Sequence, residues 1–191
     1  MKIKKGDAGY IRKRKKQVLL KTVLEFGIVI ALLVLGITQT GSRLNMLTLV
    51  AVLGCLPAAK ALVELIMLLP HQSTHPGLAQ GIAEKSSLLT CCYDMVITST
   101  QKAMPVDAIV ILDQTICGYT SSKKTNPEEV GKHIKQMLVQ NQYTKVSVKI
   151  FSDYTAFLTR AEGMQNMASV NRPDTQKKEK AIKNIILQIS L

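Results

Sequence analysis

Four side chains that could ligate a metal fall within a short stretch of the sequence, at His71, His75, Cys91 and Cys92. Imidazole and thiolate groups are the ligands that Zn²⁺ prefers in proteins. The two cysteines are adjacent, however, and no Cys-x-x-Cys pair is present, and adjacent cysteines fit tetrahedral coordination poorly. We therefore expect two linker histidines and partly buried thiols here, with neither a metal nor another cofactor.

Asp107 lies in a predicted strand that is followed by a second strand and then a helix. Over residues 93–151 this order resembles that of the restriction-endonuclease-like domains, and the resemblance implies an Asp/Glu-x-Lys motif on the strand after the first acid. The corresponding segment here reads TICGYTSSKK, with serines in place of an acid two residues before Lys123 and Lys124. Metal-assisted hydrolysis would lack a ligand, so the resemblance extends to the fold alone.

No other arrangement in the sequence indicates catalysis. A Gly-x-Gly-x-x-Gly or Walker motif is absent, so nucleotide binding has no support. Ser121, Ser122 and Ser152 have only His133 as a possible activating base, and the run KHIK places that histidine on a polar, solvent-facing side of a helix. We therefore predict no catalytic residues.

Four charged residues interrupt two long apolar segments. Their pairing must be explained because an unpaired charge inside a membrane costs roughly 2.5–3.5 kcal/mol. They are Lys21, Glu25, Lys60 and Glu64. An antiparallel turn centred near residues 42–43 sets Lys21 opposite Glu64 and Glu25 opposite Lys60. We interpret them as a structural, paired intramembrane quartet near the cytoplasmic interface. The alternatives are side chains that snorkel to water, or a proton or ion path, which the aliphatic outer halves of both segments disfavour.

The two apolar segments, residues 18–37 and 44–69, each exceed or match the roughly 20 residues that span a bilayer. The polar residues 38–43 between them predict a tight turn. Eight bases precede the first segment and only Arg43 lies in the turn, so the positive-inside rule places both chain ends in the cytoplasm. We expect a multi-pass cell-membrane protein with a basic cytoplasmic tail (1–17), a transmembrane helical hairpin (18–70) and a cytoplasmic α/β domain (71–191).

Residues 71–191 carry alternating helix and strand patterns. Proline follows a capping residue at His75-Pro76 and at Asn126-Pro127, which predicts two helix starts. The expected helices cover residues 76–90, 127–141, 154–169 and 175–188, and the expected strands cover 93–100, 106–112, 115–120 and 145–151. The order α-β-β-β-α-β-α-α predicts an α/β (α+β) fold with a mixed sheet of about four strands covered by helices. The last helix is expected to pack on this sheet, with the membrane surface as the alternative.

Most of the formal net charge of +12 is concentrated at the N-terminus. Because this tail directly precedes a membrane segment, we expect it to contact anionic lipid rather than nucleic acid. The four cysteines in 191 residues are too sparse for a disulfide framework and indicate reduced thiols. The basic residues of the tail are Lys2, Lys4, Lys5, Arg12, Lys13, Arg14, Lys15 and Lys16, against the single acid Asp7.

The run TGSRLNMLTLVAVLGCLPAAKALVE, the run DYTAFLTRAEGMQNMASV and the ending IILQIS resemble an uncharacterised bacterial family of two-transmembrane-helix proteins with a small cytoplasmic α/β domain. The resemblance covers most of the chain and implies no established activity or site residues. Some members carry an O-linked GlcNAc-transferase-like label, but this domain is too small for a sugar-nucleotide transferase. We expect a membrane-anchored, non-catalytic interaction or regulatory protein with a membrane or cytoplasmic protein partner, or a homo-oligomer. The alternative is an enzyme with an unrecognised site on a degenerate restriction-endonuclease-like fold.

Overall fold

The computed structural model describes residues 4–41, 45–99, 102–170 and 175–191. The chain divides into two compact units. One unit comprises residues 12–70, and the other comprises the described residues up to Ile11 together with residues 71–191. The first described residues therefore group with the sheet domain, whereas the sequence had suggested a separate tail up to residue 17.

Residues 12–70 form a helical hairpin made of α1 (Tyr10–Thr40) and α2 (Met46–Leu68). The helices pack through small residues on α2, because Ala51, Ala58 and Ala61 are all buried. Gly54 continues this row, and a Cβ atom at that position would lie 3.2 Å from Cγ2 of Val29. The glycine thus allows the two helices to approach closely.

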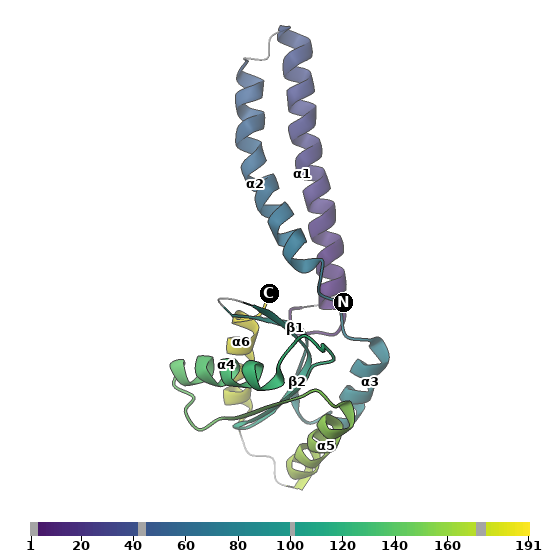
Figure 1. Cartoon of the computed structure of the whole chain (residues 1–191), viewed down its shortest axis with the longest axis vertical. Helices are drawn as coiled ribbons and strands as arrows, with labels where there is room; N and C mark the ends of the chain where they lie inside the picture. Colours follow the sequence, from purple (N-terminus) through teal and green to yellow (C-terminus); the bar gives the residue numbers. More distant parts are fainter. Residues whose placement is uncertain (1–3, 42–44, 100–101, 171–174) are drawn as a thin grey trace. The chain divides into compact units, whose positions relative to one another are not determined.

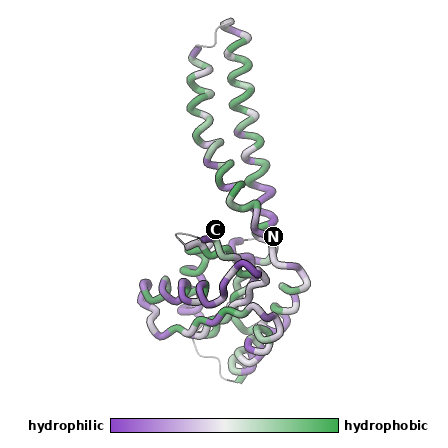
Figure 2. Tube along the Cα trace, viewed as in Figure 1, coloured by the Kyte–Doolittle hydropathy of each residue, from purple (hydrophilic) through white to green (hydrophobic). Residues whose placement is uncertain are grey.

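Most of the exposed residues further along both helices are aliphatic. Figure 2 shows hydrophobic colour along most of the hairpin and hydrophilic colour at the start of α1. Both helices are long and apolar enough to cross a membrane, and only 17% of the apolar window of each is buried. A core helix of a water-soluble protein would bury most of that window. The predicted turn residues Ser42 and Arg43 lie outside the described residues.

The other unit contains a four-stranded sheet with the order β1-β2-β3-β4; Figure 1 labels β1 and β2 in this unit. The strands β1 (Thr90–Thr98), β2 (Ala103–Leu112) and β3 (Thr115–Tyr119) form an antiparallel meander. The strand β4 (Ser147–Phe151) is parallel to β3, and the helix α4 (Pro127–Gln140) connects the two. This mixed sheet confirms the predicted fold class.

Two pairs of helices cover the two faces of the sheet. The helices α3 (Pro76–Lys85) and α5 (Tyr154–Val170) share one apolar core with the sheet, and α4 and α6 (Gln176–Gln188) share the other. Ile182 and Ile186 of α6 are almost completely buried in the second core. The last helix therefore packs on its own sheet, as expected.

One helix is shorter than the sequence predicted. α3 begins after the N-cap His75, whose Nδ1 accepts a hydrogen bond from the Gly77 amide at 3.3 Å, but it ends at Lys85 rather than near residue 90. Residues 90–92 instead belong to β1, where Thr90 pairs with Ile111 of β2. Pairing with a neighbouring strand has overridden the local helical pattern here.

The outer edge of β1 is covered by segments from both ends of the chain. The Tyr93 amide donates to the Gly6 carbonyl at 2.8 Å, and the Leu191 amide donates to the Val96 carbonyl at 3.0 Å. The Thr98 amide also donates to the Ile189 carbonyl, at 2.9 Å. These bonds satisfy backbone groups that an edge strand would otherwise expose.

Asp94, in the middle of β1, joins the first turn of α1 to the chain after α2. Its Oδ2 accepts from the Ile11 amide at 3.4 Å, and its Oδ1 accepts from the Thr74 amide at 2.7 Å. The residue is 3% exposed and has a φ of 52°, a left-handed conformation that aspartate tolerates better than most residues. One buried carboxylate therefore holds the two segments that lead into and out of the hairpin.

Replacing Asp94 tests this junction. Asp94→Ala removes both acceptors and should lower the free energy of unfolding by about 2–4 kcal/mol, since hydrogen bonds to charged groups are worth about 1.5–3 kcal/mol each. Asp94→Asn keeps one acceptor and the tolerance for positive φ, so its loss should be smaller. Urea denaturation of the full chain in detergent would measure both, and hydrogen exchange should quicken at Ile11 and Thr74. A loss below about 0.5 kcal/mol for Asp94→Ala, the size of an ordinary surface change, would contradict the role.

Candidate functional site

A groove in the sheet domain lies between α4 and the edge strand β4. It has a volume of about 790 Å³. One wall is formed by residues 126–135, at the start of α4, and the other by residues 148–151 of β4 with the two residues that follow the strand. The residues that line it are Asn126, Pro127, Glu128, Gly131, Lys132, Lys135, Val148, Lys149, Ile150, Phe151, Ser152 and Asp153.

The backbone of β4 is open toward this groove. The Ser147 amide donates to Gln114 and the Phe151 carbonyl accepts from Thr120, both at 2.9 Å, so the alternate residues starting at Ser147 direct their backbone groups to β3. Since a parallel ladder alternates in this way, Val148 and Ile150 direct theirs outward. Both line the groove, and within the described ranges neither bonds to a segment outside the sheet.

Three lysines surround the open edge. Lys132 and Lys135 extend from α4 and Lys149 from β4, and all three are exposed. In the part of the chain that the structure describes, none of them forms an ion pair. The Lys149 ammonium lies 5.0 Å from the centre of the Phe151 ring, a distance at which cation and ring attract each other.

Both acids of the groove lie at helix N-termini. Asp153 accepts from the amides of Thr155 at 3.2 Å and Ala156 at 3.1 Å, at the start of α5. Glu128 lies in the first turn of α4, where a negative charge favours the helix dipole. Three lysines and two acids line the groove, so it keeps a small net positive charge. Its two acids are not grouped as metal-assisted hydrolysis needs.

The structure separates the four residues of the possible zinc site. Cys92 is fully buried in the core beneath α4 and α6, whereas the half-buried Cys91 packs against the core on the α3 and α5 side. His75 caps α3, and His71 is buried at the start of the domain. Among the described residues no three His, Cys, Asp or Glu side chains are grouped to hold a metal ion.

Asp107 and His133 also differ from catalytic groups. The Asp107 carboxylate accepts from the Ser121 amide at 2.5 Å, so it stabilises the turn after β3. His133, which the sequence placed in solvent, is half-buried, and its Nε2 has no hydrogen-bond partner among the described residues. Neither side chain lines the groove.

Burial, rather than a catalytic neighbour, raises the pKa values of thiol and phenol groups in the sheet. Loss of solvation raises the pKa of Cys92 to about 12, and it also raises the pKa values of Cys117 and Tyr119. Raised pKa values keep these thiols in the protonated, unreactive form, so they act as packing residues rather than nucleophiles.

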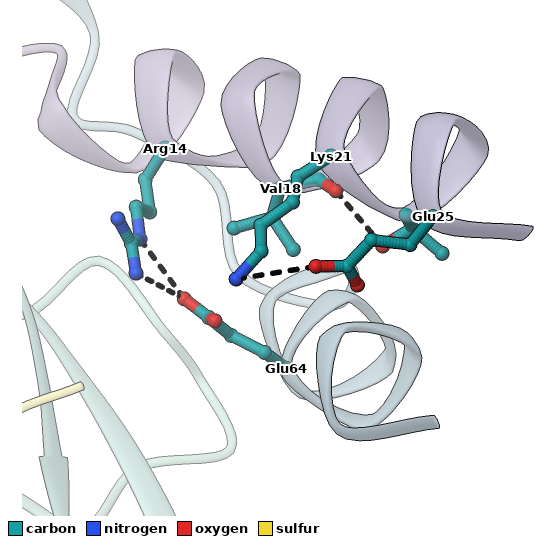
Figure 3. Close-up of polar contacts among 6 residues, drawn as sticks. Arg14, Val18, Lys21, Glu25 and Glu64 are labelled. Carbon is teal, nitrogen blue, oxygen red and sulfur yellow. Dashed lines mark hydrogen bonds and ion pairs between the residues drawn. The ribbon is translucent and has the colours of Figure 1, made fainter. Parts of the chain in front are cut away.

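The hairpin charges pair differently from the expected quartet (Figure 3). Glu64 is bound by Arg14, whose Nε and Nη2 lie 2.9 and 2.5 Å from Oε1. Lys21 instead contacts Glu25, one turn further along α1, at 3.6 Å. Lys60 is exposed and makes no ion pair within the described ranges. The cross-helix pairs Lys21–Glu64 and Glu25–Lys60 are therefore not formed.

Side-chain chemistry explains the preference of Glu64 for Arg14. The guanidinium group offers two donors in a fixed plane, whereas a lysine offers a single charged point. The overall helix register still agrees with the expected turn, because the Lys15 ammonium reaches the Leu69 carbonyl at 2.8 Å. Oε2 of Glu25 is buried without a partner among the described residues, so the Lys21–Glu25 contact leaves that carboxylate half satisfied.

Sequence reasoning missed the groove and its lysines. The alternation of KVSVKIF placed Lys149 opposite the apolar face, but only the strand order shows that β4 is an edge. In comparisons with known proteins, no family model matches the chain, and no curated protein or solved structure matches it significantly. A function must therefore be argued from the groove and the hairpin themselves.

A double-mutant cycle should detect the Arg14–Glu64 pair. Because the two side chains are 42% and 37% exposed, Arg14→Met and Glu64→Gln should be coupled by only about 0.5–1 kcal/mol. The matched cycle of Lys60→Met with Glu25→Gln should be additive. Thermal or denaturant unfolding in one detergent would measure both cycles. Coupling in the second cycle but not in the first would restore the quartet.

Alkaline pH should weaken the fold through Cys92. Its folded pKa lies above the ordinary value near 9, so the stability that its burial contributes is present below about pH 9 and is lost as pH rises toward about 12. The urea midpoint should fall between pH 8 and pH 10.5. Cys92→Ala should reduce this fall, and Cys55→Ala, on α2, should not. Equal pH dependence in all three proteins would refute the assignment.

Proposed function

We propose that this chain is a membrane-anchored, non-catalytic binding protein whose sheet domain engages a protein partner through the groove between α4 and β4. The observation that carries the proposal is the open edge of β4, with outward backbone groups of Val148 and Ile150 beside exposed lysines. A row of unpaired strand groups is a surface that another chain can bind. We also propose that the chain belongs to the bacterial two-transmembrane-helix family that its sequence resembles.

The hairpin supplies the anchor in this proposal. Two apolar helices with an aliphatic exterior support insertion in the cell membrane as a multi-pass protein. The bases Arg12–Lys16 fall in the first turns of α1, where each contributes about 1 kcal/mol of attraction to an anionic leaflet. The same bases favour a cytoplasmic location for both chain ends.

Reporter fusions test the anchor and its orientation. A reporter that is active only outside the cytoplasm should be inactive after Leu191 and active when inserted after Gly41. The reason is the excess of bases before the first apolar segment. Both fusions should sediment with membranes after an alkaline carbonate wash. Activity after Leu191, or release by the wash, would contradict the proposal.

Site-specific photocrosslinking in cells tests the binding role. A photoreactive residue at position 149 should form a stoichiometric adduct with another protein, and the same residue at position 180, on the exposed side of α6, should not. Equal adducts at both positions, or an adduct only with a second copy of this chain, would count against a dedicated partner site. Mass spectrometry of the adduct would identify the partner.

A further inference from the structure

The two edges of the sheet differ in what covers them. The edge of β1 is paired with backbone near Gly6 and near Leu191. The edge of β4 faces a groove of about 790 Å³, a volume within the range of ordinary ligand sites. The described chain thus closes one edge with its own termini and leaves the other accessible.

The shape of the groove matches an extended chain. Its two walls run along a strand and a helix, and between them the N–H and C=O groups of Val148 and Ile150 point outward. Gly131 of α4 lies close to this edge, since a Cβ there would be 3.8 Å from the Val148 carbonyl, an ordinary van der Waals distance. An added strand could bond to these groups in the manner of a sheet neighbour.

The charges around the edge select the chemistry of the added strand. Lys132 and Lys135 flank it from the helix side, and Lys149 flanks it from the strand side. A second copy of β4 would bring Lys149 next to another Lys149 and is disfavoured by repulsion. A strand that carries carboxylates would instead place negative charges among three lysines that have no acidic partner in the described chain.

We propose that the groove binds an extended, acidic peptide segment of a partner protein, which adds to the sheet as a fifth strand beside β4. This inference rests on the proposed binding function and names the chemistry of the partner. Alternate side chains of such a strand point to opposite sides. Acids on one side would meet Lys132 and Lys135, and side chains on the other would meet Lys149 and Phe151.

Defined peptides test the proposal on the full chain in nanodiscs of zwitterionic phosphatidylcholine. The probe is a blocked, fluorescein-labelled seven-residue peptide that alternates glutamate and valine. One control replaces each glutamate by lysine, and a second replaces each valine by proline. The second control keeps the charge but removes strand-forming N–H groups. Fluorescence anisotropy should show saturable binding of the probe, at least about tenfold tighter than either control.

Variants locate the site on this chain. Lys132→Glu with Lys135→Glu, and separately Lys149→Glu, should weaken the probe about tenfold or more, because attraction becomes repulsion. Lys180→Glu on α6 makes the same charge change outside the groove and should leave binding unchanged. Val148→Pro removes one outward N–H at an edge position that tolerates proline, and it should also weaken binding. Hydrogen exchange should show new protection at Val148 and Ile150 with the probe bound.

The outcomes separate this inference from the function on which it rests. Equal binding of the glutamate–proline peptide, or no new protection at Val148 and Ile150, would overturn strand addition. If the peptide does not bind but a partner is still crosslinked at position 149, the acidic strand is overturned and the binding function stands. Absence of both peptide binding and crosslinking would overturn both. Probe binding that is lost in Lys149→Glu and retained in Lys180→Glu would establish the site.

Discussion

The outer edge of β1 is the constraint on which the sheet domain depends. Three segments that are far apart in the sequence meet there, through hydrogen bonds to the backbone of β1 or to the Asp94 carboxylate. Gly6 pairs with Tyr93, Leu191 pairs with Val96, and the Asp94 carboxylate binds the amides of Ile11 and Thr74. Because buried backbone groups must be paired, these bonds hold Gly6, Ile11, Thr74 and Leu191 against β1.

A second buried carboxylate performs a similar task at the start of β1. Glu179 of α6 is fully buried, and it accepts hydrogen bonds from the Thr90 hydroxyl at 2.7 Å and the Asp113 amide at 3.0 Å. It therefore ties the last helix to the start of β1 and to the β2–β3 turn. A buried charge costs stability unless it is fully hydrogen-bonded, so the position of α6 is restricted by polar groups as well as by Ile182 and Ile186.

The sequence was sufficient for features that depend on local patterns. Pro127 after Asn126 marked the start of α4, and the alternation in KVSVKIF placed Val146, Val148 and Ile150 together, as the second core confirms. It was insufficient where partners are distant. Nothing near Asp94 indicates that it binds Ile11 and Thr74, and the preference of Glu64 for Arg14 depends on the reach and donor geometry of one side chain. The groove follows from strand order, which local patterns do not specify.

Lysines along an exposed strand have an ordinary explanation, because they prevent a sheet edge from pairing with another copy of the same chain. At β4 this explanation and a binding role are compatible. Lys149 alone would be enough to discourage self-pairing. Lys132 and Lys135 add positive charge from the helix on the other side of the groove, and preventing self-pairing does not require them. The edge of β1 shows that the fold can close a strand with its own backbone. At β4 it presents unpaired backbone groups within a positive groove instead, and that combination repels a like strand while favouring an acidic one.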